Sequence, residues 1–142
     1  MHPSDTVEKF IVQMPKVELH VHLEGSVQPQ TLLKLANRHN VALPANNLES
    51  LHDWHTFRDF NHFLDIYMAI SGCLRTGEDI ELIAREFLIG QAEQNIIYSE
   101  ATFTHYNQYI TNVNIDNIMP SACQGRFRKW SYVKSKSTCL VF

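Results

Sequence analysis

A regular alternation of apolar and polar residues runs from Val17 to Glu24. Successive side chains of a β-strand point to opposite faces, so this alternation predicts a strand with one apolar face and one face of titratable groups. The predicted apolar face consists of Val17, Leu19, Val21 and Leu23, and the titratable face consists of Glu18, His20, His22 and Glu24. Two histidines would therefore project from the same side of one strand.

Apolar residues at helical spacing predict helices on both sides of this strand. A capping-box pattern, Asp5-x-x-Glu8, begins a short amphipathic helix before the strand. Pro29 is well placed to begin a second helix, which would run to about Asn40. Residues 46–72 are rich in aromatic side chains and predict a short helix followed by a longer one.

A further helix and a second strand follow in the predicted order of elements. Thr76-x-x-Asp79 begins the helix, which carries an apolar stripe of period 3.6, and residues 96–103 predict a strand parallel to the first. Within this strand, Glu100 is expected to face the interior of the fold. A strand, helices and a parallel strand form the repeating unit of α/β folds, including barrels of eight such units.

The histidine pair is the strongest chemical signal in the chain. In a parallel barrel, residues at the carboxyl ends of the strands line the active-site mouth, and His20 and His22 would lie there together. Two neutral imidazoles on one side suit zinc or a similar divalent ion. The alternative is an exposed edge strand that carries two solvated histidines.

The segment Pro15-Lys-Val-Glu-Leu-His-Val-His-Leu-Glu-Gly-Ser26, with the proline-led helix after it, resembles the amino-terminal signature of the adenosine/adenine deaminase family of zinc-dependent amidohydrolases. The resemblance covers about residues 14–108. It implies an α/β fold that is a partial TIM-type (β/α)₈ barrel, with the first helix beneath it. It also implies hydrolytic deamination of an aminopurine, Zn²⁺ as the cofactor, and His20 and His22 as two of the metal ligands.

The resemblance further implies residues that contact the substrate. Glu24 aligns with a carboxylate that contacts the sugar or the ring edge, and Phe60 and Leu64 align with an apolar gate over the purine. Many adenosine-specific members carry Asp where this chain has Glu24, which leaves adenine, aminofutalosine-type and methylated-adenine nucleosides as candidate substrates. An aromatic helix buried as ordinary core is the alternative for the gate. Three further histidines are expected to be surface residues rather than ligands: His52, His55 and His62.

The length of the chain sets an expectation about activity. A barrel of eight strands and eight helices typically needs about 250 residues, and this chain has 142. The other zinc ligands and proton-transfer groups of the resembled family lie on later strands, and no matching segment follows here. We therefore expect no catalytic residue within this chain, an inactive fragment, and only weak zinc binding by two imidazoles.

Charge divides the chain near residue 116. Residues 1–116 hold seven basic and 15 acidic residues, whereas residues 117–142 hold five basic residues and no acidic one. The first part is interpreted as the amino-terminal part of a deaminase barrel. The second is interpreted as a basic tail outside the native barrel, from out-of-frame or misassembled sequence, in preference to a tail that binds nucleic acid or a membrane.

The expected partner is a small purine substrate, with no nucleic acid and no membrane. Two alternatives remain open at this stage: a non-catalytic remnant, and one half of a split barrel that a second polypeptide completes. The first residues do not resemble a signal peptide, and no apolar run reaches about 18 residues, so a cytoplasmic protein is expected. The cysteines show no spacing typical of a disulfide framework or a thiolate zinc site: Cys73, Cys123 and Cys139.

Overall fold

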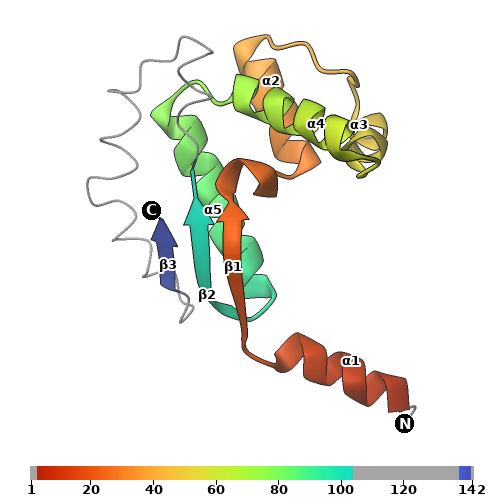
Figure 1. The fold of residues 1–142 in the computed structure, drawn as a ribbon, viewed down its shortest axis with the longest axis vertical. Helices are drawn as coiled ribbons and strands as arrows, with labels where there is room; N and C mark the ends of the chain where they lie inside the picture. The colour runs from red at the N-terminus through yellow and green to blue at the C-terminus, as the bar shows by residue number, and fades with distance from the viewer. Residues whose placement is uncertain (1–2, 104–137, 142) are drawn as a thin grey trace.

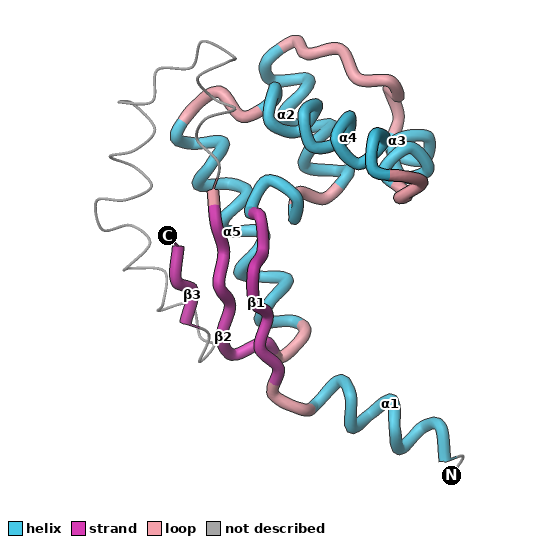
Figure 2. Tube along the Cα trace, in the orientation of Figure 1, coloured by secondary structure: helices cyan, strands magenta, loops and turns pink. Residues whose placement is uncertain are grey.

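The computed structural model describes residues 3–103 and 138–141 of the chain (Figure 1). The elements are α1 (Pro3–Gln13), β1 (Lys16–His22), the 3₁₀-helix η1 (Leu23–Ser26), α2 (Pro29–His39), α3 (Leu48–His55), α4 (Phe60–Cys73), α5 (Gly77–Glu93), β2 (Ile96–Thr102) and β3 (Thr138–Val141). The strands are all parallel, in the order β1-β2-β3. Helix α5 lies against one face of this sheet, and α2, α3 and α4 gather beyond the carboxyl end of β1 (Figure 2).

The sheet is open, as expected for part of a barrel. Among the described residues β1 pairs only with β2, so its other edge has no neighbouring strand. A parallel sheet that is covered by helices and left unclosed is the arrangement of the first strand–helix units of a (β/α)₈ barrel. The predicted fold class is confirmed.

Local capping chemistry explains where the helices begin. Pro29 is the first residue of α2, a position that its fixed backbone angle favours. The side chains of Asn47 and Asp59 accept hydrogen bonds from backbone amides in the first turns of α3 and α4. Thr76 and Asp79 form the predicted capping box of α5. The helices predicted from the sequence are thus confirmed.

Helix α1 forms as predicted, but it does not lie beneath the sheet. It projects away from the rest of the described structure (Figure 1), and Phe10 and Ile11 on its apolar side are 66% and 51% exposed. The ammonium group of Lys16 holds the carboxyl end of the helix in place, since it donates to the carbonyl oxygens of Val12, Met14 and Gln94 at 3.3, 3.0 and 2.7 Å. The expectation that α1 packs under the barrel is therefore wrong for the described structure.

The predicted division of β1 into an apolar and a titratable face is also wrong in its first half. Val17 and Leu19 are 62% and 59% exposed, whereas Glu18 turns toward α5 and accepts a hydrogen bond there. The register with β2 shifts between Glu18 and Val21, and His20 has a φ of 62°. This β-bulge adds one residue to β1, so the two halves of the strand alternate in opposite phase.

The apolar core lies between α5, η1 and the inner sides of α2, α3 and α4. Its members include Leu23, Leu32, Leu35, Leu51, Ile70, Leu74, Ile80, Ile83 and Ala101. Alternation in β2 is regular: Ser99 and Ala101 are buried toward the helix, and Glu100 lies on the other face, where Tyr98 donates to it at 2.8 Å. The predicted inward direction of Glu100 is confirmed.

Asp79 joins two helices that are distant in sequence. Its carboxylate is fully buried and contacts Arg38 at 2.5 Å and His39 at 2.7 Å, both in the last turn of α2. It also accepts hydrogen bonds from the backbone amides of Arg75 and Thr76 at 3.0 and 2.9 Å. The capping pattern in the sequence identified only the local part of this arrangement.

Strand β3 falls within the predicted basic tail. Its backbone pairs in parallel with residues 98–101 of β2. The proposed boundary at residue 116 and most of the tail lie outside the described residues. That the tail is foreign to the native barrel stays a prediction.

Candidate metal and substrate site

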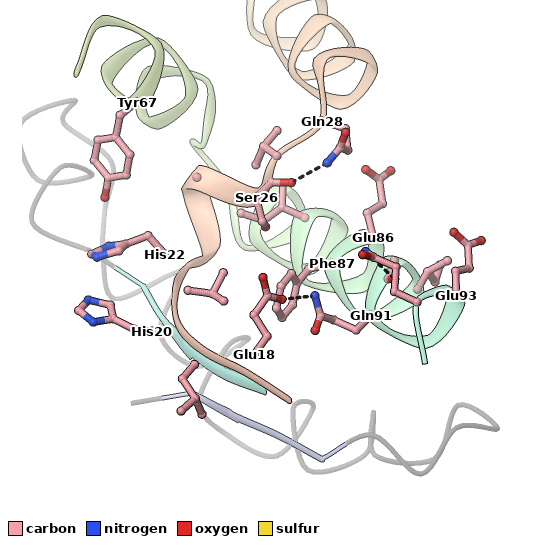
Figure 3. Close-up of a pocket in the computed structure, with 18 of the residues that line it drawn as sticks. Glu18, His20, His22, Ser26, Gln28, Tyr67, Glu86, Phe87, Gln91 and Glu93 are labelled. Carbon is pink, nitrogen blue, oxygen red and sulfur yellow. Dashed lines mark hydrogen bonds between the residues drawn. The ribbon is translucent and has the colours of Figure 1, made fainter. Parts of the chain in front are cut away.

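His20 and His22 lie side by side at the carboxyl end of β1. Their ring centroids are 5.5 Å apart and the ring planes differ by 36°. Figure 3 shows both imidazoles on the side of β1 opposite Glu18. The hydroxyl of Thr102 on β2 lies 3.5 Å from Nδ1 of His22, at the outer limit of a hydrogen bond. The predicted pairing of the two histidines on one side of β1 therefore exists, and the bulge puts Glu18 on the opposite side.

The donor atoms fit part of a zinc site. Two imidazoles on one side can supply two nitrogen ligands, and a catalytic zinc ion takes three protein ligands and a water. Within residues 3–103 and 138–141, no group of three or more His, Cys, Asp or Glu side chains could hold a metal ion. His20 and His22 could supply two of the ligands of such a site, and the pair is called the half-site below.

A cavity of about 880 Å³ follows the free edge of β1. At one end it is lined by Glu93 and Gln94 of α5, and at the other by His22 and by Tyr67 of α4. Figure 3 shows Tyr67 above the histidine pair. The cavity is large enough for a small molecule, and the half-site opens into it.

An aromatic track leads from His22 along α4. The Tyr67 ring meets His22 edge-on at 6.4 Å, Phe63 stacks on Tyr67 at 6.3 Å, and Phe60 stacks on Phe63 at 6.2 Å. The sequence interpretation had named Phe60 and Leu64, which are 67% and 41% exposed, so burial as ordinary core does not apply to them. It missed Phe63 and Tyr67, although the spacing 60, 63 and 67 places them on one helix face.

Glu24, predicted to contact substrate, is fully buried within η1. Its neighbours Gly25 and Ser26 line the cavity, whereas Glu24 is not among the lining residues. Its contact with substrate stays a prediction.

The chain matches a known family over most of its length. A family model described as adenosine deaminase matches residues 15–141. The chain belongs to the adenosine deaminase family. Its match to the aminodeoxyfutalosine deaminase of Streptomyces coelicolor is 40% identical over 105 residues, which is 74% of this chain and 27% of that protein. Its match to the adenine deaminase of Pseudomonas savastanoi pv. phaseolicola is 41% identical over 90 residues, 63% of this chain and 28% of that protein.

Solved structures of amidohydrolases share the fold of this adenosine deaminase family chain. An amidohydrolase from Burkhoderia ambifaria, solved with bound Zn, aligns with a TM-score of 0.81 at 19% identity and covers all of this chain and 38% of its own. This chain spans about a quarter of the length of the curated relatives, 27% and 28%. Across the described residues, none of the helices combines the length and hydrophobicity that a membrane crossing requires.

Three other histidines of this family member form a separate group between α3 and α4. His52 is exposed as predicted, but His55 and His62 are partly buried, and Trp54 packs edge-on against His62 at 6.0 Å. Burial is the main cause that lowers the pKa of His55, and the neighbouring His52 and His62 act in the same direction. The expectation that all three are surface residues is therefore wrong for two of them.

This group is expected to make the fold less stable in mild acid. Because His55 has a lowered pKa in the folded state, the unfolded chain takes up a proton near pH 6.5 before the folded chain does, and stability falls as the pH drops below that value. Urea unfolding at pH 7.5 and 5.5 should show the loss, and His55→Gln should reduce it. The matched control is His22→Gln, at an exposed histidine; an equal reduction there would contradict the assignment.

Proposed function

We propose that this chain carries the first metal-binding segment of a zinc-dependent enzyme that hydrolytically deaminates an aminopurine. The observation that carries the proposal is the His20–His22 pair, held together at the carboxyl end of the first strand of a deaminase-family barrel. In such barrels the reacting groups gather at that end of the strands.

His20 and His22 would hold the zinc ion through one ring nitrogen each. The Thr102 hydroxyl lies near Nδ1 of His22, so Nε2 of that ring is the nitrogen that would be available to a metal. A zinc ion held there would lower the pKa of a coordinated water toward neutrality and would supply an activated water for hydrolysis. The zinc-bound amidohydrolase of similar fold supports this choice of metal.

The aromatic track supplies a surface for a planar ring. Phe63 and Tyr67 present stacked faces beside the half-site, and aromatic side chains bind flat heterocycles by such contacts. Phe60 and Leu64, exposed on the same helix, would close over the bound ring and exclude water. Adenine is the simplest substrate of this kind, and the relatives named adenine deaminase and aminodeoxyfutalosine deaminase support a substrate with an adenine-type ring.

The remaining zinc ligands and the proton donor would come from strands beyond those described. Among the described residues Glu100 is a carboxylate on the inner face of β2, and it accepts a hydrogen bond from Tyr98. The isolated chain is therefore proposed to bind its small purine ligand and zinc weakly and to be inactive by itself.

A second candidate function is that of one half of a split barrel. Val17 and Leu19 are largely exposed on the inner face of the sheet, and the neighbouring edge of β1 is free among the described residues. Unpaired strand edges beside apolar surface favour association with another chain. Co-expression with a polypeptide that carries the remaining barrel strands should then give a stable complex.

Zinc binding tests the metal half-site. As zinc is added to the purified chain, the ring nitrogen signals of His20 and His22 should shift together in NMR spectra, with an affinity well below that of a complete site, because two imidazoles leave the ion mostly hydrated. His22→Ala should abolish the shift at His20. The signals of His52 provide the internal reference, and tight stoichiometric binding that survives His22→Ala would contradict the proposal.

A further inference from the structure

The bulge in β1 decides which way Glu18 points relative to the two histidines. Glu18 contacts α5 and Val21 packs against the core, and the register shift lies between them, where His20 has a left-handed backbone. If β1 alternated regularly with Glu18 facing α5, His20 and His22 would face α5 as well. The bulge therefore allows Glu18 to contact the helix while the imidazoles face away from it.

A chain of hydrogen bonds lies directly before the bulge. Ser99 of β2 donates to the side-chain carbonyl of Gln91 at 2.5 Å, and the Gln91 amide donates to the Glu18 carboxylate at 2.6 Å. Gln91 and Ser99 are 5% and 3% exposed. Glu18 and Ser99 are also register partners in the sheet. Gln91 of α5 thus contacts both β1 and β2 at the Glu18–Ser99 pair, which directly precedes the register shift.

The competing arrangement of β1 is a strand without a bulge. It would turn Val17 and Leu19 toward α5 and bury them, and it would move Glu18 to the inner face, as the sequence alternation by itself predicts. His20 and His22 would stay on the inner face, but the backbone of His20 would be extended and not left-handed. In the structure these two apolar side chains remain 62% and 59% exposed. Something must offset this unfavourable exposure, and the contact of Glu18 with Gln91 is the specific interaction present only in the bulged form.

We propose that Glu18, Gln91 and Ser99 form a clamp of positioning residues, which holds the bulge and with it the left-handed backbone of His20. The backbone of His20 in turn sets the direction of its ring relative to the His22 ring. The clamp does not touch the metal or the substrate, and Figure 3 shows Glu18 and Gln91 on the side of the strand opposite the imidazoles. The inference rests on the proposed metal half-site for its functional meaning, although the effect on the backbone of His20 exists without metal.

The test compares four variants of the full chain by NMR, each checked for folding by circular dichroism. Glu18→Leu removes the acceptor and favours the regular strand. Glu18→Gln keeps an oxygen that accepts from Gln91, and Ser99→Ala removes only the donor that orients Gln91. Glu93→Leu is the matched control, because this exposed carboxylate lines the same cavity two residues after Gln91 on the same helix.

The first measurement is the set of nuclear Overhauser contacts that the Leu19 side chain makes in metal-free protein. Contacts between Leu19 and α5 should be absent in the wild-type chain, Glu18→Gln and Glu93→Leu, should appear weakly in Ser99→Ala, and should be strong in Glu18→Leu, because the regular strand turns Leu19 toward the helix. The second is zinc affinity at the pair, which should fall by about tenfold or more in Glu18→Leu and remain within about twofold in the control, in line with the usual effect of removing a supporting residue behind a ligand.

A Leu19 side chain that still makes no contact with α5 in folded Glu18→Leu would overturn the proposal. If that variant does not fold, the absence of any Leu19–α5 contact in Ser99→Ala would overturn it, and the appearance of such contacts in Glu18→Gln would do the same. Absence of zinc binding in the wild-type chain would count against the proposed metal half-site alone, since the Leu19 contacts in metal-free protein still decide whether the clamp exists.

Discussion

Residues 15–103 of this chain, placed at the front of the adenine deaminase of Pseudomonas savastanoi, should give a chimera that releases ammonia from adenine. His22→Ala in that chimera should lower kcat/KM by about a thousandfold or more. The segments are similar enough for exchange, at 41% identity over 90 residues. The loss is large because a metal ligand, the activated water and the proton-transfer groups act as one unit, and removing one member disables the rest.

Ammonia release measured with a coupled assay checks this result. His52→Ala in the same chimera is the matched control, because His52 is exposed and lies on α3 away from the half-site. The isolated chain should release no ammonia under the same conditions. A chimera that retains full activity after His22→Ala would contradict the assigned metal ligand, and activity of the isolated chain would contradict its proposed inactivity.

Asp79→Ala should lower the free energy of unfolding by about 3 kcal/mol. The substitution removes a fully buried carboxylate that contacts Arg38 and His39 and caps the first turn of α5. It leaves the backbone amides of Arg75 and Thr76 without their acceptor. Loss of one partner of a buried charged network is among the most destabilising single changes. Urea unfolding followed by circular dichroism measures the difference.

The same carboxylate predicts how stability depends on acid. Burial by itself would raise the pKa of Asp79, but hydrogen bonds from Arg75, His39, Thr76 and Arg38 outweigh it and hold the pKa below its ordinary value of 3.8. The stabilising contribution is therefore complete above about pH 4 and is lost as the pH falls through the lowered value. The difference in stability between wild type and Asp79→Ala should shrink below pH 3.

Asp65→Ala provides the control for the Asp79 variant, because Asp65 is an exposed aspartate of α4. It should change stability by less than about 0.5 kcal/mol, as surface substitutions usually do. If Asp65→Ala and Asp79→Ala destabilise the chain equally, the buried network is not the cause. A difference that persists unchanged at pH 2.5 would contradict the pH dependence.

Local patterns in the sequence predict most of the elements. The capping box at Thr76 and the proline at position 29 mark real helix starts. These signals are reliable because each depends on groups within one turn of chain. The alternation of β2 and the two-residue spacing of the histidines in β1 are likewise contained within a few consecutive residues, so the sequence predicts them as well.

The site depends on contacts that no local pattern contains. Phe63 and Tyr67 become part of it because α4 folds back over β1, more than 40 residues earlier in the chain. Asp79 meets Arg38 across 41 residues. Helix α1 shows the converse, since its amphipathic pattern predicts burial that the described structure does not provide.

By itself, the amino-acid sequence determined the family, the order of helices and strands, and the pair of histidines near the end of the first strand. Tertiary structure alone decided which way the first half of that strand faces. Period-2 alternation placed Val17 and Leu19 against the helices, whereas Gln91, 73 residues after Glu18, draws the carboxylate toward α5 and the strand bulges at His20. A one-residue bulge costs little backbone hydrogen bonding, yet it turns every side chain on one side of the bulge to the opposite face of the sheet. A single contact from a distant helix can therefore decide which face those side chains occupy.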